Sequence, residues 1–114
     1  MQIVAGQITV AELSATAEAT FGDLVKAVAD VRRGLLAVDA GMHSDLEALL
    51  LDAGSAQGDL WGINLYPAEH GTAGFLEFDS MINLRPGPGN RTRSVEDPAI
   101  RAAIADLVAR IVAP

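Results

Sequence analysis

The chain has 114 residues, half of them hydrophobic and a fifth charged, and its formal net charge is −7. This composition is typical of a folded protein, and the length predicts a single domain over residues 1–114. Because the chain contains no cysteine, disulfides, thiol catalysis and thiolate metal sites are excluded.

The charges of this acidic protein are unevenly placed. Residues 1–84 hold 12 acidic and 3 basic side chains, whereas residues 85–114 hold 3 acidic and 5 basic ones. The acidic body argues against nucleic acid as a partner, since binding it needs a broad basic surface that releases counterions. The N-terminal segment lacks the pattern of a signal peptide, and no stretch reaches the roughly 18 apolar residues of a membrane span. We therefore expect a cytoplasmic protein that does not associate with membranes.

The first 41 residues predict a short strand, a helix and a β-hairpin. Residues 2–6 favour the strand, and Thr9 with Glu12 forms a capping box for a helix that ends near Thr20. Residues 24–41 alternate with a period of two around a turn at Arg32–Gly34, which indicates two antiparallel strands. A continuous helix over residues 20–38 is the alternative, but the β-branched valines and the glycine favour strands.

The rest of the chain predicts a helix, a second hairpin and a final helix. Ser44–Glu47 reads as a second capping box, for a helix that Gly54 ends. Residues 60–67 and 74–86 read as two strands joined by a polar, glycine-rich loop. Asp97–Pro98 then starts a helix whose apolar residues recur at helical spacing.

The predicted element order is therefore β-α-β-β-α-β-β-α. Hairpins connected by helices indicate an α+β fold, a two-layer sandwich with an antiparallel sheet of four to five strands. We expect the three helices to lie mainly on one face of the sheet. Such a sheet can leave its other face open.

The period of two assigns a row of polar side chains to that open face. In the strand over residues 75–84, the even-numbered apolar residues are expected in the core and the odd-numbered residues outside, and Trp61 is expected in the core. The outward row is Lys26, Asp30, Asp39, Asn64, Tyr66, Glu77, Asp79, Met81, Asn83 and Arg85. This face is either a solvated surface with cross-strand charge pairs or a binding surface or dimer interface.

Three arginines in a turn-rich connection form the second candidate site. Arg85 precedes two Pro-Gly steps, and Asn90, Arg91 and Arg93 follow them before the last helix. Backbone amides in such a turn can bind an anion, and arginine adds donors for phosphate or carboxylate. Alternatively, the arginines pair with Glu96, Asp97 or the acidic sheet face.

The sequence offers only a weak metal site. His43 and Asp45 are its candidate ligands, with Glu47 one turn further and Asp39 or Asp79 as a third ligand. Because Ser44 reads as the cap, His43 is expected before the helix and Glu47 is expected to serve the capping box. We therefore predict no metal and no cofactor.

Three segments resemble a small prokaryotic family known as a domain of unknown function. They are FGDLVKAVADV, MHSDLEALLLDAGSAQGDLWGINLYP and LEFDSMINLRPGPGNRTRSVEDPAIRAAIADLV, which cover the chain from about residue 20. The chain departs from the family pattern at Ser44 and at a Gly-Pro step of the loop. The resemblance implies a single-domain protein of about this length and brings no established activity or cofactor. The matching positions are His43, Asp45, Asp59, Trp61, Asn64, Asp79, Ser80, Asn83, Arg85, Asn90, Arg91 and Arg93.

Two functional hypotheses follow from the sequence. The first is a non-catalytic binding protein that uses the open sheet face and forms a homo-oligomer or binds a protein partner. The second is a small enzyme or ligand-binding protein that holds an anionic group at the loop from Arg85 to Arg93, with Asp79 or Glu77 as base or metal ligand. Asn64, Asn83 and Asn90 complete the residues expected at a ligand site.

Overall fold

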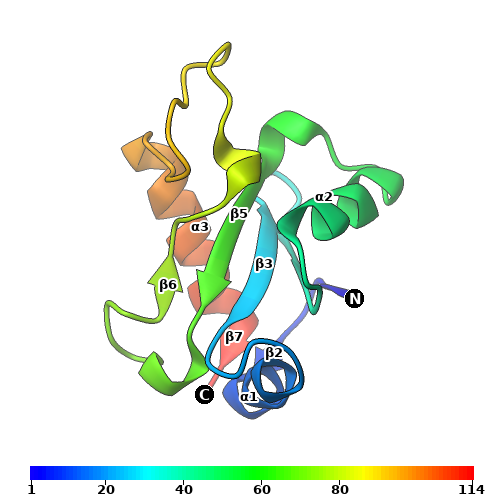
Figure 1. Cartoon of the computed structure of the whole chain (residues 1–114), viewed down its shortest axis with the longest axis vertical. Coiled ribbons are helices and arrows are strands. Elements are labelled where there is room, and N and C mark those ends of the chain that lie inside the picture. The colour runs from blue at the N-terminus through cyan, green and yellow to red at the C-terminus, as the bar shows by residue number, and fades with distance from the viewer.

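The computed structural model describes residues 1–114 as an antiparallel sheet with three helices (Figure 1). The sheet has five strands in the order β1-β4-β3-β5-β6, and each neighbouring pair is antiparallel. The strand bounds are β1 Gln2–Val4, β3 Val25–Asp30, β4 Leu35–Val38, β5 Leu60–Leu65 and β6 Leu76–Glu77. The predicted α+β class is confirmed. A short parallel pair, β2 Ile8–Thr9 with β7 Val112–Ala113, was not predicted.

Helices α1 and α3 start at the predicted caps. In α1 (Val10–Ala19), the Glu12 amide donates to Thr9 Oγ1 and the Thr9 amide donates to Glu12 Oε1, each over 3.1 Å, which completes the capping box. In α3 (Pro98–Ile111), the Ala99 amide donates to Asp97 Oδ1 over 2.8 Å. None of the three helices is long and apolar enough to cross a membrane.

Helix α2 (His43–Asp52) starts differently from the prediction. Its N-cap residue is Met42, and no side chain caps the first turn, so the second capping box at Ser44 was wrong. His43 is already helical, and its ring Nε2 lies 2.8 Å from the carbonyl oxygen of Ile63 on β5. This anchor to the sheet fixes the helix start one residue before Ser44, whose hydroxyl then falls inside the first turn.

The helices divide between the two faces of the sheet (Figure 1). Helices α1 and α3 cover one face with the main core, which includes Ala27, Trp61 and Ile63 and confirms Trp61 as a core residue. Helix α2 covers part of the opposite face through Leu46 and Leu50, which pack on Val28 and Leu60 among others. The open face is therefore smaller than expected, because it is limited to the part that α2 leaves uncovered.

The first hairpin forms as predicted, which eliminates the alternative helix over residues 20–38. Asp30, expected on the solvated face, is instead fully buried. Its Oδ1 accepts the Arg32 and Arg33 amides over 3.0 and 2.9 Å, so it shapes the turn, and its Oδ2 accepts the Ser55 hydroxyl. Gly34 has a φ of +68°, a conformation that favours glycine.

The strand predicted over residues 75–84 was mostly wrong. Only Leu76 and Glu77 pair as β6, and Met81–Asn83 forms a short 3-10 helix, η3. Asn83 is fully buried and Leu84 is 38% exposed, the reverse of the predicted faces. The reason is that the Asn83 side chain, and not the backbone of a longer β6, forms the hydrogen bonds to β5 at this point. The amide of Gly62 on β5 donates to Asn83 Oδ1 over 2.8 Å, and Asn83 Nδ2 donates to the Gly62 carbonyl oxygen over 2.9 Å.

Gly62 allows this close approach of η3 to β5. A Cβ atom at this position would lie 2.4 Å from both Cβ and Oγ of Ser80, which is fully buried. Ser80 in turn caps η3, since its Oγ accepts the Ile82 amide over 3.3 Å. The packing between residues 80–83 and β5 therefore requires glycine in the strand.

Candidate functional site

The arginine loop closes like a miniature hairpin. The Arg85 amide donates to the Asn90 carbonyl oxygen over 2.7 Å, and the Asn90 amide donates to the Arg85 carbonyl oxygen over 3.0 Å. Gly89 makes the turn with a φ of +104°. Figure 1 shows the loop projecting beside the start of α3.

Asn90 holds the base of this loop. Its side-chain Nδ2 lies 2.7 Å from the carbonyl oxygens of Asn83 and Ser94, and its Oδ1 accepts the Glu96 amide over 2.9 Å. Asn90 is buried. A buried carboxamide with this many backbone partners fixes loop shape, so Asn90 acts on a ligand only through the loop that it positions.

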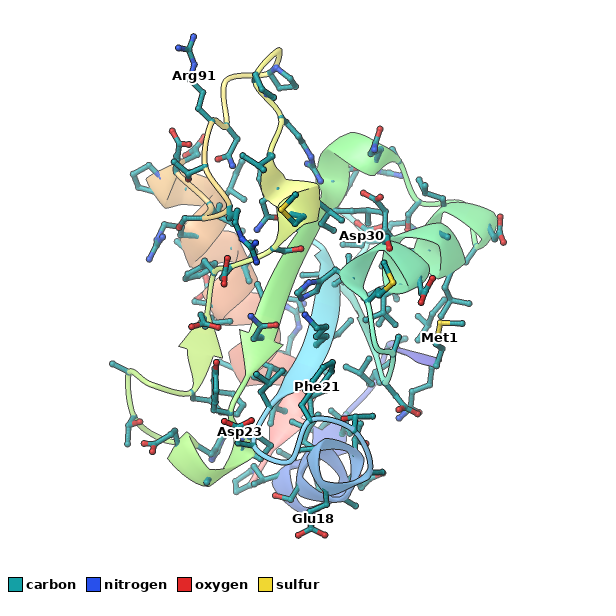
Figure 2. The ribbon with its side chains drawn as sticks, viewed as in Figure 1. Met1, Glu18, Phe21, Asp23, Asp30 and Arg91 are labelled. Carbon is teal, nitrogen blue, oxygen red and sulfur yellow. The ribbon has the colours of Figure 1, made fainter.

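The anion-binding amides that the sequence suggested are present and occupied. The amides of Arg91 and Thr92 donate to Glu96 Oε2 over 2.6 and 2.8 Å. The carboxylate of the protein itself therefore takes the place of an external anion. The exposed Arg91 side chain extends away from the body of the molecule (Figure 2) and makes no ion pair.

Arg85 lies beneath the loop against Trp61. Its guanidinium carbon lies 4.4 Å from the Trp61 ring centroid, a cation–π contact. Its Nε donates to the Ile82 carbonyl oxygen over 3.2 Å, and Nη2 donates to that of Leu60. Burial lowers the pKa of Arg85, and the Glu47 carboxylate partly opposes this shift. Arg85 makes no ion pair with any carboxylate.

A cavity of about 550 Å³ opens between the arginine loop and the start of α3; we call it the loop cavity. Its size lies within the range of roughly 300–1,000 Å³ that small-molecule sites occupy. Its wall combines two apolar side chains with one cation and two carboxylates. The cavity is lined by Trp61, Arg85, Asn90, Glu96, Asp97 and Ile100, together with Gly58, Pro88 and Gly89.

A second hollow, of about 170 Å³, lies on the sheet face beside the first turn of α2; we call it the face groove. It is lined by residues from four parts of the chain, including Lys26, Met42, His43, Ser44, Met81 and Arg93. Phe21 lies next to it, since the Lys26 ammonium lies 5.3 Å from the Phe21 ring centroid. Figure 2 labels Phe21 beside the strands, on the side facing the viewer.

The predicted polar row continues from the face groove as a hydrogen-bonded network. Asn64 Nδ2 donates to Glu77 Oε1 over 2.8 Å, and the Tyr66 hydroxyl donates to the same oxygen over 3.0 Å. Arg93 Nε donates to Asp79 Oδ1 over 2.7 Å in an ion pair. Burial raises the pKa of Tyr66, with the Glu77 carboxylate adding to the shift.

His43 is the buried titratable residue of the face groove. Since a carbonyl oxygen can only accept, Nε2 carries the proton and donates to Ile63. Burial lowers the pKa of His43, an effect that the nearby Lys26 charge reinforces and the nearby Asp79 charge opposes.

The weak metal candidates do not assemble into a site. His43 and Glu47 do share α2 one turn apart, contrary to the expectation that His43 precedes the helix. Asp45 is exposed on the first turn. No three His, Asp or Glu side chains of the chain come together closely enough to hold a metal ion.

The structure therefore separates the predicted site residues into two places. Arg85 and Asn90 belong to the loop cavity, while Arg93, with its partner Asp79 and the adjoining Asn64, belongs to the sheet face. Asn83 is structural, and Asp79 and Glu77 do not line the loop cavity. Sequence reasoning missed Phe21 and Met42 at the face and Ile100 at the cavity. Ile100 carried only a helix-core signal, and nothing in the sequence marks the other two.

Comparison with known proteins gives one finding. A family model described as "Protein of unknown function (DUF5674)" matches residues 2–111. No curated protein and no solved structure matches the chain.

Proposed function

Because that family model spans nearly the whole chain, the protein belongs to the DUF5674 family, and we propose that it is a non-catalytic binding protein that dimerises through its sheet face. The observation that carries this proposal is a gathering of exposed apolar side chains. Phe21, Met42 and Met81 are 44%, 59% and 63% exposed, and all three lie at or beside the face groove.

The composition of this face supports an interface. The protein has six large apolar side chains that are more than a third exposed, and half of them surround this one groove. Aromatic residues, methionine and arginine are enriched at interfaces, and this face has all three: Met42, Met81 and Arg93 in the groove and Phe21 beside it. The polar residues beside them are already held by hydrogen bonds, so association orders few new side chains.

The charge distribution favours a second copy of the chain as the partner. The whole chain carries a net charge of −7, which makes two copies repel. At the sheet face, however, Lys26 and Arg93 offset two of the three carboxylates of Glu77, Asp79 and Asp23. A two-fold interface needs a self-complementary patch. This face presents both signs of charge, together with exposed apolar side chains and the face groove.

The test is the mass of the protein in solution as a function of concentration. We expect light scattering to give a dimer that dissociates on dilution, and Met81→Glu to be monomeric because it places a charge in the apolar patch. Leu51→Glu is the matched control, since Leu51 is 40% exposed on α2 and does not line the groove. A wild-type protein that stays monomeric up to about 1 mM, or a Met81→Glu dimer as tight as wild type, overturns the proposal.

The loop cavity favours a second candidate function, the binding of a small ligand. Its volume and its mixed apolar and charged wall support this reading. The candidate base or metal ligands Asp79 and Glu77 lie outside the cavity, so we propose binding there and no reaction. The carboxylate of Glu96 fills the amide site, which leaves Arg85 as the group that recognises an anionic part of the ligand.

A further inference from the structure

We propose that the loop cavity binds a small zwitterion, an amino acid or a short peptide, with its carboxylate on Arg85 and its ammonium group at Glu96 and Asp97. This inference specifies the ligand class of the second candidate function and does not depend on dimerisation. It rests on three features of the cavity wall: the unpartnered Nη1 of Arg85, the carboxylate oxygens of Glu96 and Asp97 that accept no hydrogen bond, and the apolar side chains of Trp61 and Ile100.

Arg85 is held in place but only partly used. Two of its nitrogens donate to backbone carbonyls of Ile82 and Leu60, while Nη1 has no partner in the protein. The contact with Trp61 fixes the plane of the guanidinium. Because the group is partly buried and pairs with no carboxylate, an incoming carboxylate gains a charge-assisted hydrogen bond to a donor that is already oriented.

In each of the two carboxylates, only one oxygen accepts hydrogen bonds from the protein. Glu96 accepts the loop amides through Oε2, and Asp97 accepts the Ala99 amide through Oδ1. The other oxygen of each group accepts no hydrogen bond from the protein. Both residues line the cavity, and neither lies within ion-pair distance of Arg85. The wall thus presents separated positive and negative groups, as a zwitterion requires.

The charge balance decides between ligand classes. One arginine and two carboxylates give the wall a net charge of −1, so a phosphate dianion meets more repulsion than attraction. A purely cationic ligand leaves Arg85 unpaired. A zwitterion satisfies both signs at once and places its side chain against Trp61 and Ile100.

Trp61 can report a molecule bound in the cavity. It lines the cavity and its ring stacks on the Arg85 guanidinium, so a bound ligand changes its surroundings. Trp61 is also the only tryptophan of the chain, so the tryptophan fluorescence comes from this one residue.

The experiment titrates the whole protein with matched probes and follows Trp61 fluorescence and calorimetric heat. The probes are L-leucine and glycyl-leucine, which are zwitterions, isocaproate, which lacks the ammonium group, isoamylamine, which lacks the carboxylate, and inorganic phosphate. We expect at least one zwitterion to bind and each one-ended analogue to bind about tenfold more weakly or worse, because one charged hydrogen bond is lost.

Two variants test the location without touching Arg85. Gly58 lines the cavity, its φ is not positive and a Cβ there would meet no atom within 4 Å, so Gly58→Leu adds a bulky side chain to the cavity wall without a clash at Cβ. Asp97→Asn keeps the helix cap, since asparagine caps as well as aspartate, but removes the charge. Gly6→Leu is the control, because Gly6 also has open space and lines no cavity.

The expected result is that Gly58→Leu abolishes zwitterion binding, Asp97→Asn weakens it several-fold, and Gly6→Leu leaves it unchanged. Equal affinity for L-leucine and isocaproate, preferential binding of phosphate, binding that survives Gly58→Leu, or no binding by any probe each overturns the inference. None of these outcomes bears on the dimer, whose test uses Met81→Glu and leaves the cavity intact.

Discussion

At the scale of single residues, His43 combines a structural contact with a titratable group. Its ring donates a hydrogen bond to Ile63 and is 7% exposed. Burial lowers the pKa of His43 below its ordinary value of 6.5. The unfolded chain therefore binds a proton at a higher pH than the folded protein does, and acid favours unfolding through this residue.

We predict that the free energy of unfolding is undiminished above pH 6.5 and falls as the pH drops below that value towards the folded pKa of His43. Chemical denaturation at a series of pH values between 8 and about 5, above the range where carboxylates titrate, measures the slope. His43→Gln should flatten it. His70→Gln is the control, because His70 lies in an exposed loop. An equal slope in wild type and His43→Gln would contradict the assignment.

At the scale of secondary-structure elements, side chains complete the edge of β5. The β5–β6 pairing covers only Asn64 and Leu65 on β5. Beyond it, Asn83 pairs with both backbone groups of Gly62, and Arg85 takes the carbonyl oxygen of Leu60. These two side chains do the hydrogen bonding that a longer β6 would have done, and they let the chain turn towards the arginine loop.

We predict that Asn83→Ala lowers the free energy of unfolding by about 2–4 kcal/mol, because it leaves buried backbone groups of Gly62 without partners. Urea denaturation measures the change. Gln7→Ala, which removes an exposed carboxamide, should cost less than about 0.5 kcal/mol. A loss for Asn83→Ala no larger than for Gln7→Ala would mean that water replaces the side chain at this edge.

The same elements explain what the sequence could and could not predict. The starts of α1 and α3 and the first hairpin follow from local signals, namely a capping box, an Asp-Pro step and a valine alternation with a turn glycine. Residues 78–84 have the alternating pattern of a strand. Their hydrogen-bond partners, however, are Gly62 and Arg93, and only the complete fold brings these residues close to the segment. The same holds for α2, whose start is set by Ile63.

The candidate site was predictable to a similar extent. Arg85, Asn90 and Arg93 were identified because three arginines and a turn-forming asparagine fall in one turn-rich connection of an otherwise acidic chain. Their division between two sites was not predictable, since it results from the turn at η3 and the closure of the loop between Arg85 and Asn90. The use of Glu96 as an internal anion also depends on that closure.

At the scale of the whole molecule, the placement of the helices decides which surface is available. Helices α1 and α3 cover one face with the main core, and α2 covers only part of the other. On the remaining strip, Lys26 and Arg93 offset two of the three carboxylates of Glu77, Asp79 and Asp23, on a molecule of net charge −7. A second copy that approaches this strip meets local attraction within a repulsive overall field.

Salt separates these two contributions to the proposed dimer. The overall repulsion acts over distances comparable with the Debye length, which is about 10 Å at 0.1 M salt and about 3 Å at 1 M, whereas apolar contact among Met42, Met81 and Phe21 is not screened. We therefore predict that the dimer becomes tighter as NaCl rises from about 0.05 to 0.5 M. Sedimentation equilibrium of wild type and Leu51→Glu should show the same trend. A dimer that weakens with salt would mean that ion pairs between the copies, through Arg93 or Lys26, outweigh the apolar contact.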